Sequence, residues 1–147
     1  AGVDAVVVAM AGVHQIFSFD PRSGAVSIIA GNGLEGLLDG PAEEAWFAQS
    51  SGLAEDADGN IWVADSETSA LRKHVIGDGG AVTVESAIGK GLFDFGFRDG
   101  KAADARLQHP LGVTVLPVTA IDPVSLVRHE RVLATIGAIR MLEEKLA

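Results

Sequence analysis

The residues with the clearest chemical pattern are Gly31-Asn32-Gly33-Leu34-Glu35-Gly36, which match GxGxxG directly after an apolar run. Asp56 lies 20 residues after the last of these glycines. That spacing is typical of a dinucleotide site, where the N-terminus of a helix binds the pyrophosphate. However, Asp39-Gly40-Pro41 occupies the stretch where that helix would run, and proline and glycine interrupt helices. We therefore interpret Gly31–Gly36 as a glycine-rich connection.

Two further patterns resemble sites but lack a necessary part. The acidic run 55–60 resembles a calcium loop, but Gly59 is the fourth residue of the loop that begins at Asp56, whereas a calcium loop has glycine at the sixth, so a hairpin turn is favoured. Asp65-Ser66-Glu67 resembles a catalytic serine flanked by acids, but the sequence has neither a nucleophile elbow around Ser66 nor a histidine base placed near it. The four histidines show no metal-ligand spacing, and there is no cysteine. We expect no catalytic residue, no metal and no cofactor.

Composition narrows the class of protein. The 147 residues include 18 Gly, are 48% hydrophobic and carry a net charge of −9, which suits one acidic globular unit. Residues 1–118 hold 7 Lys/Arg and 16 Asp/Glu, whereas residues 119–147 hold 4 of each. The acidic part argues against DNA binding. No apolar run reaches about 18 residues and no signal peptide is evident, so we expect no membrane span and a cytoplasmic location.

Short apolar segments separated by turn residues predict a mainly β chain with antiparallel pairing. Turns are indicated at Asp20-Pro21-Arg22-Ser23-Gly24 and at Asp58-Gly59-Asn60. The predicted strands are residues 5–10, 14–19, 25–30, 52–55, 61–64, 70–76, 82–88 and 112–116.

An internal repeat supports this organisation. Residues 30–53 match residues 88–113, with two additional residues in the second copy. The offset is 58 residues before this insertion and 60 after it. The coinciding pairs are Gly31/Gly89, Gly33/Gly91, Asp39/Asp99, Gly40/Gly100, Ala42/Ala102, Ala45/Ala105 and Gly52/Gly112. Such a period indicates a supersecondary unit that is used more than once and stacks on its neighbours.

Residues 5–117 resemble NHL-repeat β-propellers, of the type that follows a thioredoxin-like domain in longer chains. The run DGNIWVADSETSALR resembles the blade signature, and the connections carrying Asp39-Gly40 and Asp99-Gly100 resemble that subfamily's insertion between blades. The resemblance implies a propeller of about six blades, of which this chain has strands for about two. The expected fold is therefore a partial NHL-type β-propeller with a short C-terminal α-helical tail. Without a cysteine, no redox role is implied.

Residues 119–147 resemble the C-terminal end of bacterial large-subunit ribosomal protein four, through the IDPVSL motif and the final LEEKLA. The turn and the second strand that a third blade would need after Leu116-Pro117 do not appear in the sequence. We expect a brief strand at Arg131–Ala134 and then a helix that Thr135 caps. Two segments are predicted, 1–117 and 118–147, with a seam at 117–119. A natural gene fusion and an artificial or accidental chimera both fit, and the second is favoured. The apolar face of the helix comprises Ile136, Ile139, Leu142 and Leu146.

These observations favour a non-catalytic binding or assembly module. Its bare blade faces would be covered by self-association, by the C-terminal helix or by another protein, and a homotrimer would supply about six blades. Two alternatives remain: a ribosome-associated protein that binds ribosomal RNA through its last 29 residues, and a nucleotide-binding enzyme that uses Gly31–Gly36. Candidate contact residues around one propeller face are Asp39, Asp65, Arg72 and Asp99, although turn capping and hydrogen bonding between blades are favoured for each.

Overall fold

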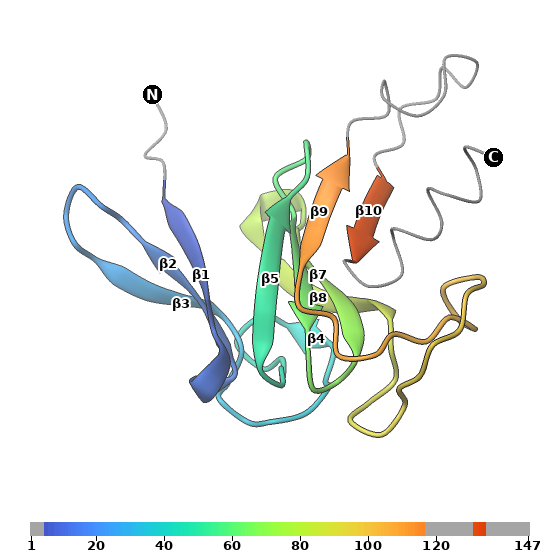
Figure 1. Cartoon of the computed structure of the whole chain (residues 1–147). Coiled ribbons are helices and arrows are strands. Elements are labelled where there is room, and N and C mark those ends of the chain that lie inside the picture. The colour runs from blue at the N-terminus through green and yellow to red at the C-terminus, as the bar shows by residue number, and fades with distance from the viewer. Residues whose placement is uncertain (1–4, 117–130, 135–147) are drawn as a thin grey trace, which may run out of the picture.

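Three antiparallel sheets lie side by side in the computed structural model, which describes residues 5–116 and 131–134 (Figure 1). The first has the order β1-β2-β3, the second β4-β8-β7-β6-β5, and the third pairs β9 with β10. The strand bounds are β1 Val6–Met10, β2 Gln15–Phe19, β3 Val26–Ala30, β4 Gly40–Pro41, β5 Ser50–Glu55, β6 Ile61–Asp65, β7 Ala70–Ile76, β8 Val82–Ile88, β9 Val113–Leu116 and β10 Arg131–Ala134. Short 3-10 turns cover Ala11–Val13 and Asp78–Gly80.

The eight strands predicted from the sequence are confirmed, and β7 and β8 have the predicted bounds. The predicted hairpin between β5 and β6 is also confirmed. Its turn is held by the Asp56 carboxylate, which accepts hydrogen bonds from the backbone N–H and the side-chain amide of Asn60 at 2.8 and 3.0 Å. Gly59 takes a φ of +81°, which glycine adopts without steric cost. Local turn chemistry thus fixes this register.

One strand and one strand pairing differ from the expectation. Gly40–Pro41, interpreted as part of a connection, forms β4 and pairs with Val84 and Thr83 of β8. Proline is tolerated there because β4 lies at the edge of its sheet. The predicted strand Arg131–Ala134 is present as β10 and pairs with all four residues of β9, so β9 has the second strand that the sequence after Leu116 did not show. This pairing joins the two segments predicted on either side of residue 117.

The hydrophobic core lies between the first and second sheets. Ile16 and Ala30 from the first sheet meet Val63 and Val84 from the second, and all four are buried. Ala42, Ala45 and Phe47, from the connection between the sheets, complete the buried cluster. Part of the connection therefore belongs to the core.

The predicted C-terminal helix and its apolar face, Ile136, Ile139, Leu142 and Leu146, lie outside the described residues. Within residues 5–116 and 131–134, no helix has the length and apolar character needed to cross a bilayer.

Candidate functional site

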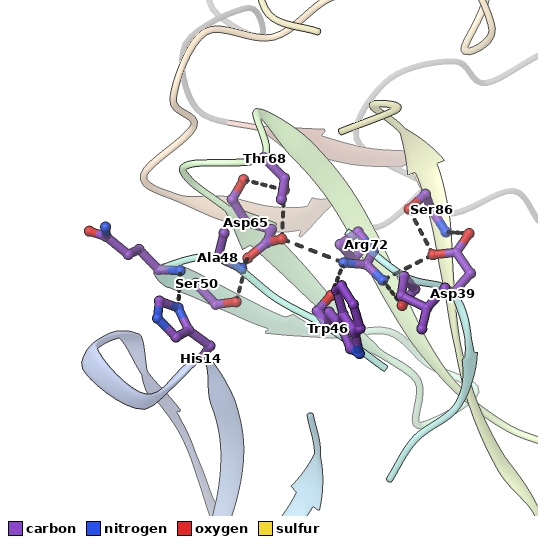
Figure 2. Close-up of polar contacts among 11 residues, drawn as sticks. His14, Asp39, Trp46, Ala48, Ser50, Asp65, Thr68, Arg72 and Ser86 are labelled. Carbon is purple, nitrogen blue, oxygen red and sulfur yellow. Dashed lines mark hydrogen bonds and ion pairs between the residues drawn. The ribbon is translucent and has the colours of Figure 1, made fainter. Parts of the chain in front are cut away.

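Arg72 of β7 lies at the centre of a buried polar network (Figure 2). Its Nη1 donates a hydrogen bond to the carbonyl oxygen of Trp46 at 2.8 Å and lies 3.5 Å from Oδ2 of Asp65. Its Nη2 donates to the carbonyl oxygen of Leu38 and to Oδ1 of Asp39, both at 2.9 Å. One fully buried guanidinium therefore meets two carboxylates and two backbone carbonyls.

The environment of this guanidinium explains why it requires so many acceptors. Its central carbon lies 4.9 Å from the centroid of the Phe47 ring, close enough for a cation–π interaction. Its Nε has no hydrogen-bond partner among the described residues. Because arginine does not lose its proton inside proteins, the charge must be balanced by the groups around it.

Asp65, the last residue of β6, is the buried carboxylate of the pair. Its Oδ1 accepts hydrogen bonds from the Ala48 N–H at 2.9 Å and the Ser50 hydroxyl at 2.7 Å, and its Oδ2 accepts one from the Thr68 hydroxyl at 2.6 Å. Burial raises the pKa of Asp65, while these hydrogen bonds and the charge of Arg72 oppose the rise. The carboxylate is therefore held in place on both oxygens.

Asp39 lies at the outer side of the network, with 45% of its side chain exposed. Besides Arg72, it binds Ser86 of β8, whose backbone N–H and hydroxyl donate to its two oxygens at 3.0 and 2.9 Å. Arg72 and Ser86 are directly opposite each other in the pairing of β7 with β8. One carboxylate thus binds a cross-strand arginine–serine pair.

The network links the first connection, residues 31–49, to four strands of the second sheet, through Ser50 of β5, Asp65 of β6, Arg72 of β7 and Ser86 of β8. Asp39, Leu38, Trp46 and Ala48 belong to the connection, and Arg72 to β7. Each charged group is engaged by another group of the fold, so the arrangement acts as an internal clamp that fixes the connection to the sheet.

The structure brings together three of the four candidate contact residues, Asp39, Asp65 and Arg72. Asp65 and Arg72 are fully buried, so they form the hydrogen bonding within the fold that the sequence favoured and do not offer a surface contact. Asp99 lies apart, exposed and without a partner among the described residues. Ser50, Thr68 and Ser86 also belong to the network and were not predicted from the sequence. The strand register would have indicated Ser86, which lies opposite Arg72.

The second connection, residues 89–111, repeats the backbone arrangement of the first. In the first connection the Gly36 N–H donates to the Phe47 carbonyl at 3.1 Å, and in the second the Gly96 N–H donates to the Leu107 carbonyl at 3.0 Å. The bond from the Trp46 N–H to the Leu38 carbonyl, at 3.2 Å, likewise corresponds to the bond from the Arg106 N–H to the Arg98 carbonyl, at 2.9 Å. The φ angles of Gly40 and Gly100 also match, at 138° and 148°. The offset of 60 residues inferred from the sequence therefore holds in three dimensions.

The glycine pattern Gly31–Gly36 has a structural role. The Gly31 N–H donates to the Ala42 carbonyl and the Gly36 N–H to the Phe47 carbonyl, so the segment folds back on its own connection. Residues 31–49 contain no helix. The acidic run 55–60 forms the β5–β6 turn, and within residues 5–116 and 131–134 no group of three His, Asp or Glu side chains is placed to hold a metal.

No family model matches the chain. It is 38% identical over 113 residues to the protein SUPPRESSOR OF QUENCHING 1, chloroplastic, of Arabidopsis thaliana, covering 74% of this chain and 11% of that protein. It is 37% and 35% identical over 131 residues to NHL repeat-containing protein 2 of Homo sapiens and Gallus gallus, covering 76% of this chain and 18% of each relative. The chain thus spans less than a fifth of the length of these relatives.

Solved structures have a similar fold. A protein of unknown function from Bacteroides thetaiotaomicron aligns with a TM-score of 0.67 and 26% identity, over 75% of this chain and 27% of its own. An auxiliary nutrient binding protein from the same organism aligns with a TM-score of 0.59 and 18% identity, over 75% of this chain and 29% of its own. These relatives and neighbours support an NHL-type repeat and a partial propeller fold.

Proposed function

We propose, from the NHL-type repeat that this chain carries, that it is a non-catalytic binding module which associates through the two ends of its propeller segment, with copies of itself or with another protein. The observation that supports this proposal most directly is the open end of the first sheet. β1 and β3 are the edge strands of that sheet, and they expose Val6 on β1 and Val26 and Ile28 on β3, with Val26 exposed by 62%. Exposed apolar edge strands are sites where another chain can add.

The opposite end of the segment is also apolar. In the second connection Phe93 is exposed by 91%, and Phe95 and Leu111 are exposed as well. β1 and β9 both contact β5, and they lie on opposite sides of it (Figure 1). The two ends are different surfaces, so a contact between one end of a copy and the opposite end of the next copy would be heterologous. Such contacts close into a ring only if the rotation between neighbouring copies divides a full turn evenly. Three copies with about two blades each would supply about six blades.

The alternatives have less support. The ribosomal RNA hypothesis depends on residues 119–147, of which only Arg131–Ala134 is described. The nucleotide hypothesis depends on Gly31–Gly36, whose backbone groups bind the connection itself. A chimeric origin, a cytoplasmic location and an absence of DNA binding stay predictions; the plant relative is described as chloroplastic. The activities of the much longer relatives are not assumed for this chain.

The mass in solution, measured by light scattering over a concentration series, tests self-association. We expect a trimer that dissociates on dilution, because the exposed apolar ends would be covered in it. Val6→Lys at the open edge should shift the chain towards the monomer, since an exposed charge on an edge strand opposes pairing. The matched control Ile76→Lys changes another exposed apolar residue, at the end of β7. A monomer at all concentrations, or equal effects of the two variants, would contradict self-association.

A further inference from the structure

The two connections offer the same set of oxygen acceptors, but the described residues occupy only the first set. In the first connection, the carbonyls of Leu38 and Trp46 and the carboxylate of Asp39 bind Arg72. The corresponding groups of the second connection are the carbonyls of Arg98 and Arg106 and the carboxylate of Asp99. We call these three groups the second acceptor set.

The backbone of the second acceptor set is already arranged as in the occupied one. The Arg98 carbonyl accepts the Arg106 N–H and the Arg106 carbonyl accepts the Arg98 N–H, at 2.9 and 3.3 Å. The Leu38 and Trp46 carbonyls accept each other's N–H groups in the same way, at 3.2 and 3.5 Å. A carbonyl oxygen can accept two hydrogen bonds, and Arg72 supplies the second bond in the first connection. In the second connection no described residue supplies it.

The two arginines of this set are directed to other partners. The Arg106 guanidinium binds the Asp94 carboxylate at 2.7 Å, and the Nε of Arg98 donates to the Asp104 carbonyl at 2.7 Å. The Asp99 carboxylate therefore remains as the charged group of the set, and an arriving guanidinium would neutralise it.

We propose that the second acceptor set is a docking site for a β-hairpin of another polypeptide that presents an arginine and a serine directly opposite each other on adjacent strands. The arginine would bind Asp99 and the carbonyls of Arg98 and Arg106, and the serine would bind the other oxygen of Asp99. Arg72 and Ser86 of this chain make these contacts with the first connection. The inference rests on the proposed binding function but not on self-association.

The first sheet of a second copy of this chain does not present the arginine–serine pair that the second acceptor set requires. His14 and Ser69 each come directly before a strand, β2 and β7, and both have a positive φ. Their side chains accept a hydrogen bond from the backbone N–H of Gln49 and His109, respectively. These shared features show that β2 corresponds to β7. The residues that match Arg72 and Ser86 are then Phe17 and Ile28, which are opposite each other in the first sheet. They would place an apolar pair against Asp99. The second acceptor set therefore favours a hairpin with the arginine–serine pair over the first sheet of a second copy.

The test uses a fluorescent, backbone-cyclised peptide with the sequence of residues 70–88, which carries the arginine–serine pair; cyclisation is needed because an isolated hairpin is marginally stable. Its binding to the full chain is followed by fluorescence anisotropy. We expect saturable binding, and we expect Asp99→Asn in the chain to weaken the affinity at least tenfold. A peptide with Gln at the Arg72 position should bind the unchanged chain with an affinity that is lower by the same factor. The matched variant Asp104→Asn, another exposed carboxylate of the same connection, should bind within twofold of the unchanged chain.

Three results would overturn the inference: no saturable binding, equal affinity for the Asp99→Asn chain and the unchanged chain, or equal binding of the Gln-substituted peptide. Circular dichroism of each variant confirms that the sheets are retained. The outcome is separable from that of the light-scattering experiment, because a chain that is monomeric at every concentration can still bind the hairpin through Asp99.

Discussion

Arg72 shows how a buried charge can be accommodated at the level of single residues. Its two terminal nitrogens reach acceptors on both sides, and the planar arrangement of these donors suits carboxylates and carbonyls at once. Asp65 in turn is held by two hydroxyls and one N–H. The desolvation of each group is compensated by the other, so removing either one leaves an unbalanced buried group.

We expect Asp65→Asn to lower the free energy of unfolding by about 3 kcal/mol, because the buried guanidinium loses a carboxylate and the new amide brings donors to a site filled by donors. Chemical denaturation measures this loss. Asp58→Asn is the matched control, since Asp58 is exposed in the β5–β6 turn and should change stability by less than about 0.5 kcal/mol. A loss below about 1 kcal/mol for Asp65→Asn would mean that Asp39 and the carbonyls balance Arg72 without it.

At the scale of elements, the contact between β5 and the start of β9 depends on a missing side chain. A Cβ atom on Gly52 would lie 2.5 Å from the Gly112 Cα and 2.9 Å from the Leu111 carbonyl oxygen. Both of these atoms belong to the backbone, so neither can move without displacing the chain. The close approach lets the second connection pass beside β5, where the Ser51 hydroxyl donates to the Leu111 carbonyl at 3.0 Å.

Gly52→Ala is therefore expected to separate β9 from β5. Overpacking against backbone should cost about 1–3 kcal/mol, and the amides of Val113–Leu116 should exchange faster with solvent. Hydrogen exchange followed by mass spectrometry measures this change by segment. Gly12→Ala is the control, because nothing lies within 4 Å of a Cβ at that position. Unchanged exchange in β9 would show that the segment can shift without loss of its contacts.

At the scale of the whole molecule, the stability of the fold is coupled to pH through His74. This histidine of β7 is buried, and neither ring nitrogen has hydrogen-bond geometry with a described residue. Burial lowers the pKa of His74, and the backbone near Ile29 opposes this shift only in part. The folded chain therefore keeps the imidazole neutral at a pH where the unfolded chain has already bound a proton.

We expect the free energy of unfolding to fall as the pH decreases below about 6.5, the ordinary value for histidine, towards the lower pKa of the folded state. The slope is at most about 1.4 kcal/mol per pH unit for one proton. Denaturation of the unchanged chain and of His74→Met between pH 5 and 7 measures the difference. The raised pKa of Asp65 makes the folded state more stable as the pH falls, which is opposite to the effect of His74. Because Asp65 is present in both proteins, the difference between their pH profiles reports on His74 alone. Parallel pH profiles would contradict this assignment.

The strand positions, the β5–β6 hairpin and the repeat of the two connections could be predicted from the sequence, because apolar patterning and turn residues act over a few neighbouring positions. The roles of Asp39 and Asp65, the pairing of β4 with β8 and that of β10 with β9 were decided only by the tertiary structure. Asp39 meets Arg72 and Ser86 across 33 and 47 residues of chain. No local pattern specifies such partners, because a buried charge selects whichever acceptors the packed elements bring to it.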